Sequence, residues 1–141
     1  MKKILSLFLF LAVVSFAGAH PSSAYVSFDG GGPVITFDSE TIDFGTLVQG
    51  NEAIRTFTFT NTGDQPLVIS SIKGQCGCTT FPDSWPKDPV PPGGKASFRV
   101  KYDTAVRVGM FDKKIMVYCN ATNAVNGVFE VKIKGNVQAA Q

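Results

Sequence analysis

The sequence is poor in the side chains on which most catalytic sites depend. It contains one histidine (His20), one tryptophan and three cysteines among 141 residues. Since the only histidine lies close to the start, the part expected to fold offers no serine–histidine arrangement for nucleophilic catalysis. No glycine-rich phosphate-binding loop follows a strand either. These shortages favour a protein that is not an enzyme and that carries no cofactor.

An excess of charge of one sign is also missing. The chain has 13 lysines and arginines against 11 aspartates and glutamates, but Lys2 and Lys3 belong to a predicted leader. Removing these 2 from 13 leaves 11 cations against 11 anions. A neutral chain with singly interspersed charges has no electrostatic reason to bind nucleic acid or an acidic membrane surface.

Long hydrophobic runs are absent apart from one at the start. Lys2 and Lys3 precede an apolar run over Ile4–Phe16, which is followed by small residues ending at Ala19. This pattern predicts a signal peptide over residues 1–19, with an alternative cleavage after residue 24. The alternative is an uncleaved anchor, but the run is shorter than the ~20 residues of a membrane span. The mature protein is therefore expected to be exported, periplasmic or secreted, with no transmembrane segment.

The remainder is long enough for one domain with a real core. Residues 20–33 are small, polar and glycine-rich, as is typical of a flexible lead-in. We expect the domain over residues 34–138 and a short tail over residues 139–141.

The domain shows strand patterns and almost no helical periodicity. Within Ile54–Thr60, phenylalanines alternate with threonines, and similar alternation runs through residues 96–102 and 128–137. Val34–Phe37 and Ile42–Phe44 are interpreted as two parts of one opening strand. Short strands separated by turns predict an all-β fold, an Ig-like antiparallel β-sandwich of about seven strands. Asn126-Gly127 predicts the hairpin turn before the last strand.

Cys76-Gly77-Cys78 is the one local motif that could carry chemistry. A disulfide between Cys76 and Cys78 is possible in an exported chain, and Gly77 would relieve part of the strain of so small a ring. The two thiolates could instead hold a soft metal such as Cu(I) or Zn(II), although two ligands do not complete a zinc site. The third interpretation is that both are small structural thiols that shape the turn.

Trp85 is a further candidate for binding, and Cys119 is the remaining cysteine. Trp85 lies in a proline-rich connection, where it either covers one end of the core or stacks on a ligand. Cys119 alternates with apolar residues, which predicts a buried thiol. In an Ig-like strand order Cys119 lies at the far end of the sandwich, out of bridging reach of Cys76 and Cys78.

A family resemblance covers Ile42 to Val137. The matching motifs occur in the order typical of that family: Phe57-Thr58-Phe59-Thr60-Asn61-Thr62-Gly63 with Pro66-Leu67-Val68-Ile69, Cys76-Gly77-Cys78-Thr79, Pro91-Pro92-Gly93-Gly94, Val100-Lys101-Tyr102-Asp103, Val108-Gly109-Met110-Phe111 and Ile133-Lys134-Gly135-Asn136-Val137. They resemble the bacterial exported domain-of-unknown-function family 1573, which is similar to Hydin-type and major-sperm-protein-type Ig-like domains. The sequence departs from the pattern at Gln75, usually serine, and at Cys119.

The resemblance implies a binding or scaffolding module of the bacterial envelope and names no activity. We therefore expect a non-enzymatic exported domain that binds another envelope or secreted protein. An exposed sheet edge is the first candidate surface, and the loop of Cys76, Gly77 and Cys78 with Trp85 is the second. The alternative is a periplasmic thiol protein that uses the cysteine pair for redox chemistry or soft-metal binding.

Overall fold

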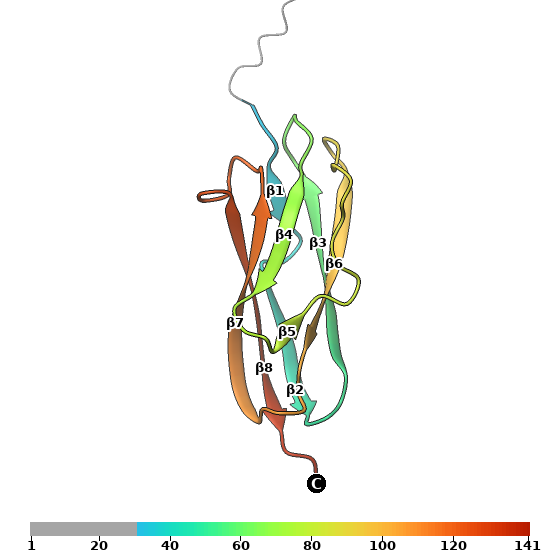
Figure 1. Ribbon diagram of the computed structural model, residues 1–141, viewed down its shortest axis with the longest axis vertical. Helices are drawn as coiled ribbons and strands as arrows, with labels where there is room; N and C mark the ends of the chain where they lie inside the picture. The colour runs from blue at the N-terminus through green and yellow to red at the C-terminus, as the bar shows by residue number, and fades with distance from the viewer. Residues whose placement is uncertain (1–30) are drawn as a thin grey trace, which may run out of the picture.

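A computed structural model describes residues 31–141 as eight strands arranged in two four-stranded sheets, with no helix in that range (Figure 1). The strands are β1 (Ile35–Phe37), β2 (Thr41–Val48), β3 (Ala53–Asn61), β4 (Ile69–Gly74), β5 (Thr79–Thr80), β6 (Lys95–Tyr102), β7 (Gly109–Cys119) and β8 (Val128–Gln138). The predicted all-β sandwich is confirmed. The predicted leader, His20 and the lead-in up to residue 30 lie outside the described residues.

The strand orders are β1-β3-β6-β5 in the first sheet and β2-β8-β7-β4 in the second. There are eight strands where about seven were expected, because the opening strand divides into β1 and β2 and the short β5 was not expected. The last hydrogen bond of the opening strand to the first sheet runs from the Asp38 amide to the Thr58 carbonyl. Two residues later, the Glu40 carbonyl accepts from the Lys132 amide in the second sheet. The crossover makes β2 parallel to β8, so the sandwich is not wholly antiparallel.

Alternation along the strands fills the space between the two sheets. Phe57 and Phe59 of β3 are buried, while the threonines between and beside them face outward or are half-buried. Phe37 of β1 packs against the rings of Phe57, Phe59, Phe98 and Phe129, with ring centroids 5.4–6.3 Å apart. Burial of these rings removes a large apolar area from water and holds the first sheet on the second.

One polar side chain, Asn61, is fully buried at the end of β3. Its Nδ2 group donates to the carbonyls of Gln65 (2.7 Å) and Val90 (2.9 Å). Its Oδ1 atom accepts from the amides of Val34 (3.3 Å) and Gly63 (3.0 Å). Asn61 therefore joins three separate segments of the chain at one end of the sandwich.

The predicted hairpin before the last strand is present at Asn126-Gly127. Both residues have positive φ, 52° and 77°, as a two-residue hairpin turn with right-handed strand twist requires. Val125 and Val128 exchange backbone hydrogen bonds across it, each 3.0 Å long.

In residues 31–141 no helix is long and apolar enough to cross a membrane.

Candidate functional site

The loop of Cys76, Gly77 and Cys78 carries the chain from one sheet to the other. The structure joins Cys76 to Cys78 as a disulfide, with Cα atoms 5.2 Å apart. The Cys78 carbonyl accepts from the Asp103 amide (2.8 Å), and Thr79 enters β5 opposite the end of β6. Cys78 is buried and Cys76 half-buried, whereas Gly77 is exposed with no atom near its missing Cβ. The disulfide thus closes a connection on the flank of the sandwich.

With the two sulfurs bonded to each other, neither is available as a thiolate ligand. Residues 31–141 contain no group of three metal-ligating side chains. Cys119, the free cysteine, is buried at the other end of β4, opposite Ile69. Burial raises the pKa of its thiol, partly opposed by a hydrogen bond from the Ala121 backbone. The expected burial of Cys119 is confirmed, and its thiol is poorly reactive in the folded protein.

Trp85 packs against the core beside the middle of β6, and not over one end of the sandwich. It is half-buried in the segment that follows β5 and lines a hollow with Asp83 and Arg99. Arg99 binds Asp83 through two hydrogen bonds, which fasten this segment to β6. The Lys87 ammonium lies 3.5 Å from the Trp85 ring centroid, so one face of the ring is covered. The buried Nε1 of Trp85 has no partner within residues 31–141.

Gln75, just before the disulfide loop, ends the pairing of β4 with β7. Its amide donates to the Lys114 carbonyl (3.0 Å), and its side-chain Oε1 accepts from the Lys114 amide (3.1 Å). Lys114 therefore turns both backbone groups toward β4. The amide and carbonyl of every second residue of a strand point to the same side, so those of Asp112 and Met110 also point toward the β4 side. β4 has already ended before it reaches them. Neither makes a hydrogen bond on that side within the described part of the chain.

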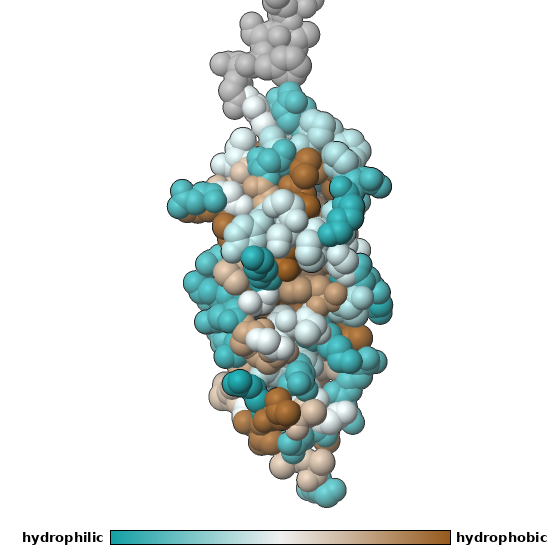
Figure 2. All heavy atoms as spheres, in the orientation of Figure 1, coloured by the Kyte–Doolittle hydropathy of each residue, from teal (hydrophilic) through white to brown (hydrophobic). Residues whose placement is uncertain are grey.

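We call residues 109–113 of β7 the open edge. The exposed apolar side chains near it are Met110 (90% exposed) and, in the connection from β6, Val106 (73%) and Val108 (57%). Figure 2 shows hydrophobic atoms at the surface near the end of the sandwich where this connection lies. An unpaired backbone beside exposed apolar side chains is the usual template for adding a strand from another chain.

Most of the other sheet edges are covered or interrupted, although β1 pairs with β3 only over Phe59–Asn61 and β5 pairs with β6 only over Lys101–Tyr102, so parts of β3 and β6 also lack a neighbouring strand within residues 31–141. The Asn123 side chain pairs with β1 as a strand would, accepting from the Ile35 amide (3.1 Å) and donating to its carbonyl (2.8 Å). β5 has only two residues. The free edge of β4 is limited at both ends by other parts of the chain. Leu67 pairs with Val90 just before β4, and Gly74 at its end lies against Thr79.

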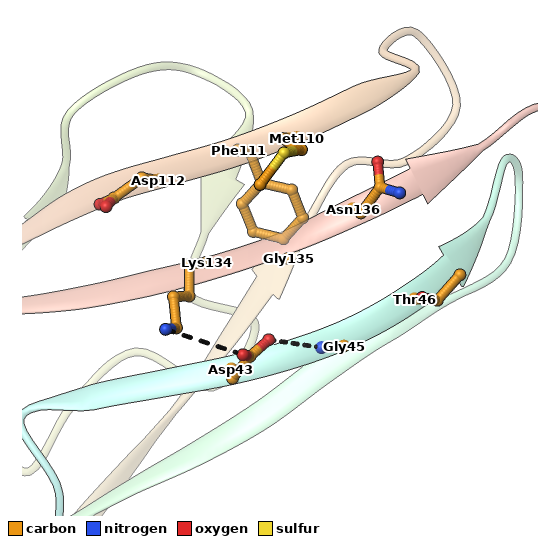
Figure 3. Close-up of a pocket in the computed structure, with 9 residues that line it drawn as sticks. All are labelled: Asp43, Gly45, Thr46, Met110, Phe111, Asp112, Lys134, Gly135 and Asn136. Atoms are coloured by element: carbon orange, nitrogen blue, oxygen red, sulfur yellow. Dashed lines mark hydrogen bonds and ion pairs between the residues drawn. The ribbon is translucent and has the colours of Figure 1, made fainter.

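The edge of β2 is interrupted by a bulge. Its register with β8 shifts between Asp43 and Thr46, and Gly45 there has a φ of 68°. The Gly45 amide donates to the Asp43 carboxylate (2.8 Å), whose second oxygen lies 3.8 Å from the Lys134 ammonium. Figure 3 shows these groups facing one another in a hollow of the second sheet, so their charges are already matched. Such a bulge makes a poor template for a further strand.

Comparison with known proteins agrees with this architecture. The model of a family described as a protein of unknown function, DUF1573, matches residues 35–137. The chain belongs to the DUF1573 family. The resemblance seen in the sequence is thereby confirmed. No curated protein matches the chain.

Solved structures share the fold of this DUF1573 domain. A protein of unknown function from Porphyromonas gingivalis is 21% identical with a TM-score of 0.62, and the match covers 74% of this chain and 46% of that one. A PapD-like domain of human CEP192 is 9% identical with a TM-score of 0.59, covering 76% and 87% of the two chains. The secreted serine protease VesC from Vibrio cholerae is 10% identical with a TM-score of 0.57, covering 74% and 23%. At these identities the likeness shows the fold alone.

Sequence reasoning selected the disulfide loop and missed the open edge next to it. Gln75 stood out only as a departure from the family pattern, and Met110 and Asp112 were not singled out. No local signal marks them, because the freedom of their backbone depends on where β4 stops pairing. The open edge and the loop of Cys76, Gly77 and Cys78 together form the candidate site.

Proposed function

We propose that this DUF1573 domain is a non-catalytic exported module that binds another envelope or secreted protein by strand addition. The observation that carries the proposal is the open edge of β7, where the amides and carbonyls of Met110 and Asp112 face outward without a partner in residues 31–141. Main-chain hydrogen bonds at such an edge supply affinity, and alternate side chains supply specificity.

A substitution at Asp112 tests the proposal. Since its amide faces away from β8, Asp112→Pro removes a hydrogen-bond donor needed by an incoming strand and no bond of the native ladder. We expect the variant to fold and to lose its partner in a pull-down from envelope extracts. Asp112→Ala is the matched control, because it removes the same carboxylate and keeps the amide. Equal recovery of the partner by Asp112→Pro and Asp112→Ala would rule out strand addition at this edge.

The second candidate function is a thiol role for the cysteine pair, which is supported by the disulfide in a short loop where Cys76 is half-buried and Gly77 exposed. A bond between cysteines two residues apart closes a very small ring, and an attacking thiol would reach it through the half-buried Cys76 rather than the buried Cys78. In this role the Cys76–Cys78 disulfide would accept two electrons from a partner dithiol, which becomes a disulfide, or the dithiol form would reduce a partner disulfide to two thiols.

Alkylation of the protein in cells tests this role. If the pair cycles, mass spectrometry after trapping will find both bridged and doubly alkylated Cys76–Cys78. Cys119 serves as an internal control, because burial raises the pKa of its thiol and it should alkylate only after denaturation. A fully bridged pair under both oxidising and reducing growth conditions would contradict the thiol role and leave the disulfide structural.

A further inference from the structure

The open edge lies beside a small cationic hollow, which tells what kind of segment would fit it. The hollow has a volume of about 310 Å³ and lies between β7 and the connection from β6. Arg107 and Lys113 line it, and no carboxylate does. Neither cation has an ion pair within residues 31–141. The nearby Asp103 carboxylate does not line the hollow and accepts from the Ala105 amide (2.9 Å).

Lys113 occupies an unusual place in its strand. It alternates with Phe111 and Ile115, both buried, so its side chain leaves β7 on the core side. It remains half-buried because β4 no longer covers this part of β7, and the ammonium can reach the open flank. A lysine on the inward side of an edge penalises an apolar strand, which would bury its charge without a partner. An acidic strand would neutralise that charge.

We propose that the open edge binds an extended acidic segment of a partner protein, with a carboxylate seated between Arg107 and Lys113. The proposal rests on the strand-addition function above and names its ligand class. Residues of the incoming strand that point inward carry Asp or Glu and meet the two cations. Residues that point outward lie beside Met110 and are apolar. The added strand continues the line of β4 below Gln75, next to the disulfide loop.

A synthetic peptide tests this without knowledge of the natural partner. The probe is a labelled, N-acetylated peptide of alternating valine and glutamate, about seven residues long as strands commonly are. Fluorescence anisotropy should show binding to the full domain, at least about tenfold tighter than for the valine–lysine and valine–glutamine analogues. Absence of binding at about 1 mM, or equal affinity for the three peptides, would overturn the proposal.

Two matched variants separate the cations from net charge. Arg107→Ser with Lys113→Ser should abolish the preference for glutamate. Lys73→Ser with Lys132→Ser removes the same two charges from exposed positions on the outer face of the second sheet and should leave the preference intact. If both double variants lose the preference equally, overall charge explains the binding and the carboxylate site is wrong.

N-methylated peptides distinguish failure of the acidic specificity from failure of strand addition. All valine amides of a strand point to one side and all glutamate amides to the other, so methylation of one set should abolish binding and methylation of the other should not. Tolerance of both sets would mean electrostatic adsorption and would overturn strand addition. Sensitivity to one set, with no effect of Arg107→Ser and Lys113→Ser, would uphold strand addition and overturn the acidic ligand.

Discussion

Replacement of Asn61 by leucine should cost the folded protein about 4 kcal/mol or more of its free energy of unfolding. The leucine side chain has a similar size but cannot hydrogen-bond the amides of Val34 and Gly63 or the carbonyls of Gln65 and Val90. Each buried backbone group left without a partner costs about 1–3 kcal/mol. The loss should appear as a lower midpoint in chemical denaturation followed by tryptophan fluorescence.

Asn123 provides a control of the same residue type. It also bonds two backbone groups, the amide and carbonyl of Ile35, through partly buried hydrogen bonds, but Asn123 itself is exposed, so water can take the place of its side chain. Asn123→Ala should therefore cost only about 1 kcal/mol. If Asn61→Leu and Asn123→Ala lower stability by similar amounts, burial of the Asn61 network does not carry the stability assigned to it.

The sequence predicts the sandwich because alternation survives in most strands. Phe57 and Phe59 between threonines identify β3 and its buried face. Asn126-Gly127 identifies the hairpin, because both residues tolerate the positive φ that the turn requires. Cys119 is found as a buried thiol from its neighbours alone. In each case the signal lies within a few residues of the feature that it predicts.

The remaining features depend on contacts between distant segments. The opening strand divides at Asp38–Glu40 because the chain leaves β3 after the bond to Thr58 and pairs next with Lys132 in the other sheet. The open edge arises because Gln75 closes the ladder of β4 with a side-chain oxygen. Neither event changes local hydropathy, so a pattern of alternating residues reports neither. The sequence therefore predicts that some exposed sheet edge binds a partner, but it does not show that this edge is the open edge of β7.

Phe111, in the open edge, and Gly135, opposite it on β8, should show strong coupling. Phe111 is buried and stacks on Tyr102 with centroids 3.8 Å apart. A Cβ at Gly135 would stand 2.8 Å from this ring and 3.1 Å from the Gly45 carbonyl oxygen. We expect Phe111→Ala to cost about 3 kcal/mol or more through the cavity it leaves. Gly135→Ala should cost about 2 kcal/mol through overpacking.

In the double variant the added methyl group occupies space that the ring has vacated. Its loss of stability should therefore be smaller than the sum of the two single losses by about 1 kcal/mol or more, measured by urea denaturation of the four proteins. Gly135→Ala combined with Phe57→Ala, which truncates a ring outside this contact, should be additive within about 0.5 kcal/mol. Additivity in both pairs would show that the ring does not impose glycine at position 135. Coupling with Phe111 alone would explain why the closing family motif has glycine at position 135. The Phe111 ring, in the open edge, needs the space that a side chain there would fill.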